Sequence, residues 1–280
     1  MLRLPRLVLA ATILLISSGC NTPDAVSKFC GSANTTLAAA IPVFKDLPAS
    51  CLREVNLQKG IGAFEAVQTD PSCDLIAKQA EGAVAATKIL SDYFSALNSL
   101  ATFGTAKVGS DASSLLSKTE AAVGAGSAAQ TALGSMAGFL ATAATGAYQQ
   151  RALNKDLTVV SKNIGDVVDA LVTIVQNNYI DQALTAENQK LGTRYKEFAL
   201  TSTSAEVLLN LDDRWHVDER SVDAKRASAE TLISALQAIK NGTADLAANA
   251  HSVKAKELPG LLNPYITQIQ MLIPQIQKGF

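Results

Sequence analysis

Apolar residues recur along most of this chain at alternating spacings of four and three, the period of a helix with one buried face. The first regular stretch begins at Cys73 and ends near Gly104. Its repeating positions are Ile76, Ala80, Ala83, Thr87, Leu90, Phe94, Leu97 and Ala101. We expect a turn over residues 105–111 and a new helix from Asp111 or Ala112.

Two longer stripes in the second half of the chain predict an antiparallel helical hairpin. The first would run from Lys155 to Ala199, about 65 Å at 1.5 Å per residue, with a slip in register near Asn177. Such a length needs an equally long partner, and a heptad-like stripe supplies one after a break at residues 201–204. The positions of this second stripe are Trp215, Val222, Ala229, Leu232, Leu236, Ile239, Leu246 and Val253.

The two ends of the chain are less regular. Residues 24–46 predict a first helix that bends or stops near Pro42 and Pro48, and residues 47–71 predict an irregular connection. A last amphipathic helix is expected from about Pro264. Because no alternating strand pattern is evident, we expect an all-α fold, an elongated up-and-down bundle with a long antiparallel, coiled-coil-like hairpin.

The first twenty residues have the order of a signal peptide. A positive start with Arg3 and Arg6 precedes an apolar run over residues 7–16, and small residues then lead to Cys20. Ten apolar residues are too few to span a bilayer core, which needs about twenty. The residues Ser-Ser-Gly-Cys at 17–20 resemble the lipobox of bacterial lipoproteins, with serine where leucine is most common in that family.

This resemblance implies that the Cys20 thiol carries a diacylglyceryl group, that cleavage occurs before Cys20, and that the new amino group is acylated. Two or three acyl chains are enough for a stable membrane anchor. Asn21 follows, not the aspartate that retains lipoproteins in the inner membrane of enteric bacteria, so the periplasmic or surface face of an outer membrane is favoured. The alternative is an ordinary cleaved signal peptide in which Cys20 is a chance residue.

The chain is accordingly expected to have three parts: a signal peptide over residues 1–19, a lipidated N-terminus with the first helix and the connection over 20–71, and the helical bundle over 72–280. The bundle itself is not assigned to a family.

Without residues 1–20 the chain has 22 basic and 25 acidic residues, a net charge of −3, which argues against nucleic acid as a partner. Aromatic residues are sparse and alanine is abundant, so closely packed helices are expected to fill the core.

Three further cysteines, Cys30, Cys51 and Cys73, lie in the first third of the chain. An oxidising compartment favours one disulfide among them. We favour Cys51–Cys73, which would close the connection between the first two helices and leave Cys30 free, although Cys30–Cys51 is nearly equivalent. No zinc or other metal site is expected, because no Cys-x-x-Cys pair or histidine lies nearby.

Residues 121–150 are unusual because they carry no charge and are rich in alanine and glycine. They include Gly134 and Gly138 at the spacing that lets helices touch, which in lipid often marks a dimer face. Their hydroxyl and amide side chains favour a tightly packed helix or helical hairpin in a water-soluble bundle over a transmembrane helix. The alternative is insertion into a membrane, as in α-helical pore-forming toxins, which the layout of residues 72–250 resembles.

The chain contains no pattern typical of a catalytic site, such as a Gly-x-Ser-x-Gly elbow, a phosphate-binding loop or a His-Glu-x-x-His pair, and we expect no cofactor. The group Asp212, Asp213, His216 and Glu219 is interpreted as a solvated helix start.

Trp215, the sole tryptophan, and Arg214 form a candidate partner contact, because these residue types dominate binding hot spots. The leading hypothesis is a non-enzymatic, lipid-anchored helical protein that acts as a scaffold or binds an envelope protein partner. The second hypothesis is a membrane-active bundle that inserts residues 121–150.

Overall fold

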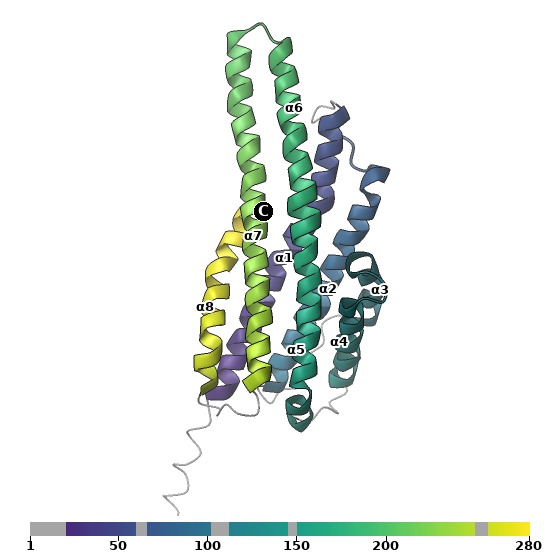
Figure 1. Cartoon of the computed structure of the whole chain (residues 1–280), viewed down its shortest axis with the longest axis vertical. Coiled ribbons are helices and arrows are strands. Elements are labelled where there is room, and N and C mark those ends of the chain that lie inside the picture. The colour runs from purple at the N-terminus through teal and green to yellow at the C-terminus, as the bar shows by residue number, and fades with distance from the viewer. Residues whose placement is uncertain (1–20, 60–65, 102–111, 145–149, 250–256) are drawn as a thin grey trace, which may run out of the picture.

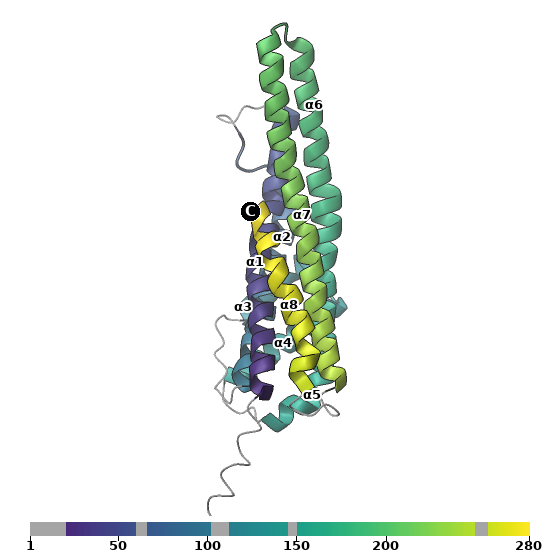
Figure 2. The same cartoon turned by 90° about the vertical axis from the view of Figure 1, so that its left-hand side faces the viewer.

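The computed structural model describes residues 21–59, 66–101, 112–144, 150–249 and 257–280. Every regular element in these ranges is helical, and no strand occurs in them. The all-α bundle expected from the helical period is therefore confirmed. Its helices run along one long axis (Figure 1, Figure 2). Residues 1–20, which include the expected signal peptide and Cys20, lie outside the described residues.

The first helix, α1 (Asn21–Lys59), is longer than its prolines predict. The expected stop near Pro42 or Pro48 and the irregular connection over residues 47–59 are wrong, because both prolines lie inside the helix. Residues 66–70 lie outside any helix, as expected, and residues 60–65 lie outside the described residues. An interior proline removes one backbone hydrogen bond and costs about 3 kcal/mol. Packing outweighs that cost, since side chains around and between the two prolines are buried: Val43, Phe44, Leu47, Ser50 and Cys51.

Three helices follow on one side of α1. A short 3₁₀ turn, η1 (Pro71–Cys73), leads into α2 (Asp74–Ala101), which lies along α1, and α3 (Ala112–Val123) and α4 (Ala128–Ala144) pack against α2. The helix predicted from Cys73 and the new start at Ala112 are confirmed. Helices α2 and α3 approach so closely that a Cβ on Gly82 would lie 2.8 Å from that of Ala122.

The predicted antiparallel hairpin is present. Helix α5 (Gln150–Thr173), the π-helix η2 (Ile174–Leu184) and α6 (Thr185–Thr201) follow one another without interruption, and α7 (Ala205–Asn249) returns alongside them. The predicted register slip near Asn177 falls within η2. A π turn holds more residues than an α turn, so the buried stripe stays on one face across the slip.

The last helix, α8 (Leu258–Ile276), ends in the 3₁₀ turn η4 (Gln277–Gly279) and packs against α7 and α1. It begins before the predicted start at Pro264, because Pro259 occupies its first turn, where no backbone N–H donor is needed. One continuous hydrophobic core joins α1, α2, α4, α5, η2, α7 and α8. Small residues permit this close packing: a Cβ on Gly242 of α7 would lie 2.6 Å from the Phe29 ring of α1.

Candidate interaction surface

The α6–α7 hairpin extends past the ends of the other helices (Figure 1, Figure 2). Leu191 on α6 and Val222 on α7 are buried, and no residue between them along the chain is buried. We call residues 192–221 the distal hairpin. Its two helices touch each other, and each of its residues is exposed or only partly buried among the described ranges, so this section is available to a partner.

Trp215 is packed inside the distal hairpin. Its indole lies over Gly192 of α6, where a Cβ would come within 3.1 Å of the ring, and the Tyr195 ring meets it edge-on at 5.9 Å. Its Nε1 donates a hydrogen bond to Glu219 at 3.0 Å. Trp215 is therefore half-buried and helps to hold the two helices together, whereas Arg214 beside it is exposed. The partner contact predicted for these two residues stays a prediction.

A second contact inside the distal hairpin lies beside Trp215. The Tyr195 hydroxyl donates to the carboxylate of Asp218 on α7 at 2.7 Å. Partial burial and this carboxylate raise the pKa of Tyr195 to about 12, so the phenol stays protonated and keeps donating. The two aromatic side chains of α6 and α7 thus stiffen the hairpin where no third helix supports it.

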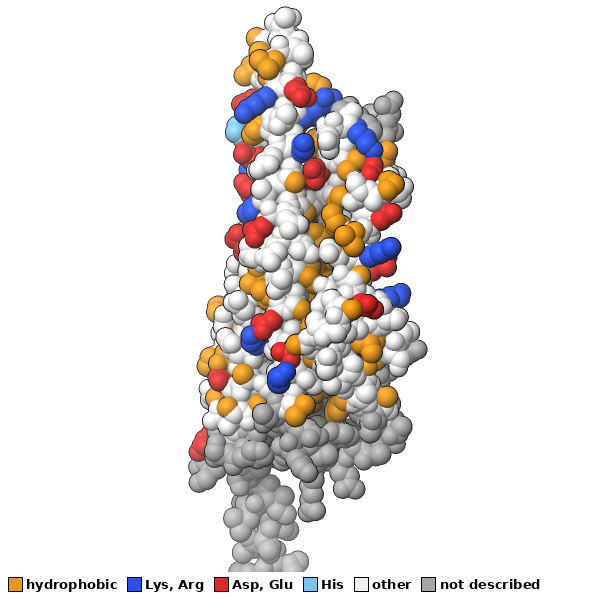
Figure 3. All heavy atoms as spheres, turned by 45° about the vertical axis from the view of Figure 1, so that its right-hand side comes forward, with side chains coloured by type: hydrophobic (Ala, Val, Ile, Leu, Met, Phe, Trp, Pro, Cys, Tyr) orange, Lys and Arg blue, Asp and Glu red, His pale blue; other side chains and the backbone are white. Residues whose placement is uncertain are grey.

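Exposed apolar side chains gather at the end of the distal hairpin. Leu200 and Leu209 are 87 % and 70 % exposed, and three neighbours are also exposed. We call this set the apolar tip: Phe198, Leu200, Val207, Leu208 and Leu209. Figure 3 shows hydrophobic side chains at the hairpin end and charged side chains of both signs along the hairpin below it. Sequence reasoning missed this patch.

A buried polar cluster fixes the base of the hairpin to α1. Its first centre is Glu187 on α6, whose side chain is only 7 % exposed. Arg53 of α1 donates to this carboxylate from Nε at 2.5 Å and from Nη2 at 3.0 Å. The Ser50 hydroxyl, also on α1, donates to it at 2.6 Å. These three charge-assisted bonds tie α6 to α1 just before the hairpin leaves the bundle.

The second centre of the buried polar cluster is Asp46 on α1. Arg53 donates to its two carboxylate oxygens at 3.0 and 2.7 Å, Tyr179 of η2 donates at 2.7 Å, and Lys225 of α7 at 3.2 Å. Burial alone would raise the pKa of Asp46, but hydrogen bonds from Arg53 and Tyr179 and the nearby cations outweigh burial and lower it. The carboxylate is therefore ionised and links α1 to both arms of the hairpin.

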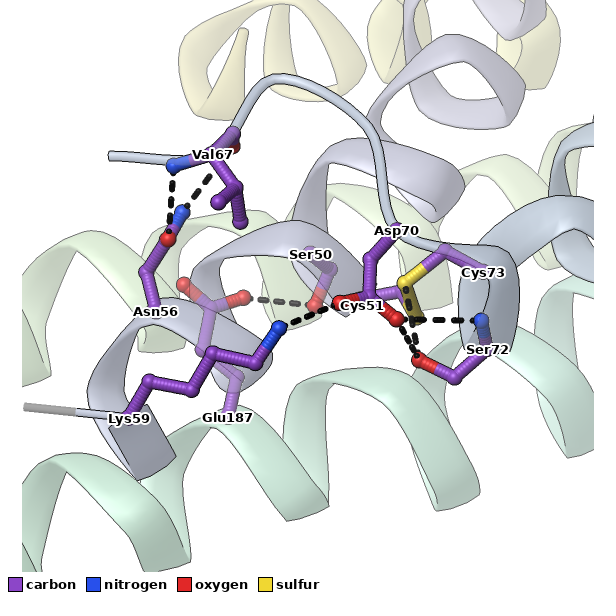
Figure 4. Close-up of a disulfide and its surroundings, with 9 residues drawn as sticks. All are labelled: Ser50, Cys51, Asn56, Lys59, Val67, Asp70, Ser72, Cys73 and Glu187. Carbon is purple, nitrogen blue, oxygen red and sulfur yellow. Dashed lines mark hydrogen bonds and ion pairs between the residues drawn. A yellow bond between two sulfur atoms is a disulfide. The ribbon is translucent and has the colours of Figure 1, made fainter. Parts of the chain in front are cut away.

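The disulfide joins Cys51 of α1 to Cys73 of η1 beside this cluster (Figure 4). The favoured pairing is confirmed, and Cys30 is free and buried. Burial raises the pKa of the Cys30 thiol to about 12, so this cysteine behaves as an apolar core residue.

Side-chain contacts tie the segment before η1 back to α1 (Figure 4). Lys59 pairs with the Asp70 carboxylate at 2.5 Å, and this hydrogen bond holds the pKa of Asp70 well below its usual range. Asp70 also accepts from the backbone N–H of Ser72 at 3.0 Å, which caps η1. The Asn56 amide exchanges two hydrogen bonds with the backbone of Val67. This end of α1 is thus held by both covalent and polar contacts.

The uncharged stretch over residues 121–150 contains a turn and α4. Gly124 and Gly126 have φ angles of 83° and 68°, which place the turn between α3 and α4. The predicted small-residue pair does not lie at a close helix contact: a Cβ on Gly134 or Gly138 would meet no atom within 4 Å. Buried side chains on the other face, including Leu133, pack α4 against its neighbours. Membrane insertion of this stretch stays a prediction.

Two further expectations concern metals and membrane spans. Within the described ranges, no group of three or more histidine, cysteine, aspartate or glutamate residues is arranged to bind a metal ion. His216 lies 3.8 Å from Asp212 and 3.5 Å from Glu219 on an exposed face of α7. These residues lie well inside α7, so the interpretation of this group as a helix start is wrong.

None of the helices described here combines the length and hydropathy that a bilayer span requires.

Comparisons of the chain with protein-family models, with curated proteins and with solved structures found no match.

Proposed function

We propose that this protein is a non-enzymatic, lipid-anchored spacer of the cell envelope that presents its distal hairpin to a protein partner. The observation that carries this proposal is the placement of two features at opposite ends of the bundle. Helix α1 begins at Asn21 at one end, and the turn of the distal hairpin lies at the other (Figure 1, Figure 2). Cys20, the expected site of acylation, directly precedes Asn21.

The length of α7 supports a spacer role. This helix alone spans 45 residues, about 68 Å at 1.5 Å per residue. Since α1 is helical from Asn21, little chain separates the expected acyl chains from the bundle. An acylated Cys20 in an outer membrane would therefore hold the hairpin end about 70 Å from that membrane surface if the bundle stands upright.

The base of the hairpin supports the same role, because a spacer must transmit position without bending. The buried polar cluster joins α1 to η2, α6 and α7, and the Cys51–Cys73 disulfide lies beside it. The charges of this cluster are paired with one another inside the bundle. In this proposal the pairing serves to fix the helices.

The anchor is tested by replacing Cys20 with serine in the full chain. We expect the wild-type protein to carry acyl chains by mass spectrometry and to fractionate with the outer membrane. The Cys20→Ser variant should lack the acyl chains and lose its outer-membrane localisation. Equal outer-membrane retention of both proteins would overturn the lipid-anchor proposal.

The partner contact is tested by photocrosslinking in cells. A photoreactive residue at Arg214 or Val217, both exposed on the distal hairpin, should form an adduct with one specific envelope protein. The matched control is Leu75 on α2, which is 65 % exposed outside the hairpin. Adducts of the same strength from Leu75, or recovery of the monomer alone from every hairpin position, would count against a hairpin-bound partner.

A further inference from the structure

We infer that the apolar tip of the distal hairpin inserts into the surface of a lipid bilayer. This inference goes beyond the proposed protein-binding role of the hairpin sides and does not depend on acylation of Cys20. It rests on four properties of the tip: its position, its low charge, its area and the hydrogen bonding of its turn.

The tip is the outermost part of a hairpin that no other helix accompanies (Figure 1). Leu200 at the end of α6 and Leu209 in the second turn of α7 are among the most exposed large apolar side chains of the described residues. Both lie within eight residues of the hairpin turn on either side. A flat surface that approaches the hairpin end-on therefore meets the polar turn over residues 202–204 first and these apolar side chains directly behind it.

The tip is almost free of charge. From Phe198 to Leu211 the only charged residue is Glu206. The flanking charges are balanced, with three basic and three acidic residues on the adjoining turns: Arg194, Lys196, Arg214, Glu197, Asp212 and Asp213. An end with the single exposed carboxylate of Glu206 and a balanced charged zone below it fits shallow insertion at the boundary between acyl chains and zwitterionic headgroups and does not require anionic lipid.

The area of the tip favours lipid over a protein as its occupant. Five partly exposed side chains of this size present roughly a few hundred Å² of apolar surface. A stable protein interface buries about 800 Å² on each partner, so tip-to-tip pairing of two copies would be weak. A bilayer needs no matching surface, because burial of each leucine is favourable wherever it enters the acyl region.

The turn between the two helices is suited to shallow insertion because its backbone groups are partly satisfied. The Thr201 hydroxyl donates to the carbonyls of Glu197 and Phe198, and the Ser202 N–H donates to the Phe198 carbonyl at 3.1 Å. The Ser202 N–H thus satisfies the Phe198 carbonyl, one of the last four carbonyl groups of α6. The Arg194 guanidinium lies 4.1 Å from the centre of the Phe198 ring, so its charge stays on the headgroup side while its stem covers apolar surface.

The test uses residues 21–280, which contain every described element but lack Cys20, and vesicles of pure phosphatidylcholine. Flotation should show that this protein binds the vesicles, and that binding changes less than twofold between low and high salt. Replacing Leu200 and Leu209 together by glutamate should lower the partition coefficient at least tenfold. The matched control is Val217→Glu, which adds a charge at a 57 % exposed site about 18 Å along α7 from the turn and should bind like wild type.

Insertion depth gives a second, independent measurement. Trp215 is the sole tryptophan, and it lies inside the distal hairpin below the apolar tip. Brominated lipid should therefore not quench the wild-type fluorescence. In a Leu200→Trp variant the new tryptophan enters the acyl region, and brominated lipid should quench it. Circular dichroism should show equal helicity for all variants, since none of the replaced side chains is buried.

Three results would overturn the inference: no vesicle binding by the wild-type protein, equal binding by the double glutamate variant, or binding only to anionic vesicles that salt abolishes. Photocrosslinks from Leu200 to a protein in the absence of any vesicle binding would assign the tip to a protein partner. None of these results bears on acylation of Cys20, because that residue is missing from the protein tested.

Discussion

Replacing Glu187 by glutamine is the most direct test of how the hairpin is fixed to the bundle. The substitution keeps the size of the side chain but removes its charge and turns one acceptor oxygen into an NH₂ donor. That donor would face either Arg53, which can only donate, or the Ser50 hydroxyl. At least one of the charge-assisted bonds from α1 to α6 is therefore lost, and the others weaken.

The size of the effect follows from burial. A hydrogen bond to a charged group contributes about 1.5–3 kcal/mol, and the 7 % exposed Glu187 has little water to replace a lost partner. Arg53 keeps its two bonds to Asp46, so its charge is not left unpaired. We therefore expect a loss of about 2–4 kcal/mol in the free energy of unfolding, a range centred below the roughly 3–5 kcal/mol typical of a fully broken buried pair. For a chain of this size that corresponds to a fall in Tm of roughly 5 °C.

Denaturant unfolding of residues 21–280 measures this loss, and hydrogen exchange locates it, with faster exchange expected in α6. The matched control is Glu197→Gln on the same helix, where the pair with Arg194 is 3.5 Å long and exposed and should contribute less than about 1 kcal/mol. A double-mutant cycle with Arg53→Gln isolates the pairwise energy. If Glu187→Gln unfolds within about 0.5 kcal/mol of wild type, or the coupling energy is near zero, the cluster does not hold the hairpin.

Three further predictions concern the disulfide, the core and acid stability. Replacing Cys51 and Cys73 by serine should lower the free energy of unfolding by about 3 kcal/mol for a sequence separation of 22, and added reductant should then have no effect on the variant. Gly242→Ala should destabilise by about 1–3 kcal/mol because its Cβ would clash with Phe29, while Gly165→Ala, whose nearest neighbour would lie at 3.8 Å, should be neutral or stabilising in the same melts. Because the pKa of Asp46 is lowered in the folded protein, this carboxylate stabilises the fold fully above about pH 4, and the stabilisation is lost as the pH falls further. Asp46→Asn should therefore reduce the fall in the free energy of unfolding at acid pH. An unchanged dependence of that free energy on pH would contradict this.

Helical periodicity was sufficient to predict most of the fold. The stripes over α2, α5–α6 and α7 predicted the element type, the hairpin pairing and the register slip that falls within η2, because each depends on a single buried face. The length of α1 could not be predicted this way. Local propensity ends a helix at Pro42 or Pro48, and only burial against α2 and α8 keeps the chain helical through both.

The sequence contains one signal of the buried polar cluster. Glu187 lies three residues after Leu184 and four before Leu191, so it occupies a position of the buried stripe. A carboxylate at such a position needs a cationic partner. Its partner Arg53 is 134 residues away along the chain, in a segment predicted to be irregular, so the sequence could show that a partner was needed but not which residue supplied it.

Exposure of the apolar tip depends on the relative lengths of elements and not on local pattern. The uncharged residues 121–150 drew attention in the sequence, yet one face of α4 is buried against neighbouring helices. Residues 198–211 are nearly as free of charge, but a short apolar segment beside a turn is ordinarily covered by the next helix. Here no helix reaches it, because the α6–α7 hairpin extends past α1 and α2 (Figure 2). The apolar side chains at the hairpin end are therefore more exposed than the described apolar side chains of α4, which is the physical reason to test the tip for membrane binding before residues 121–150.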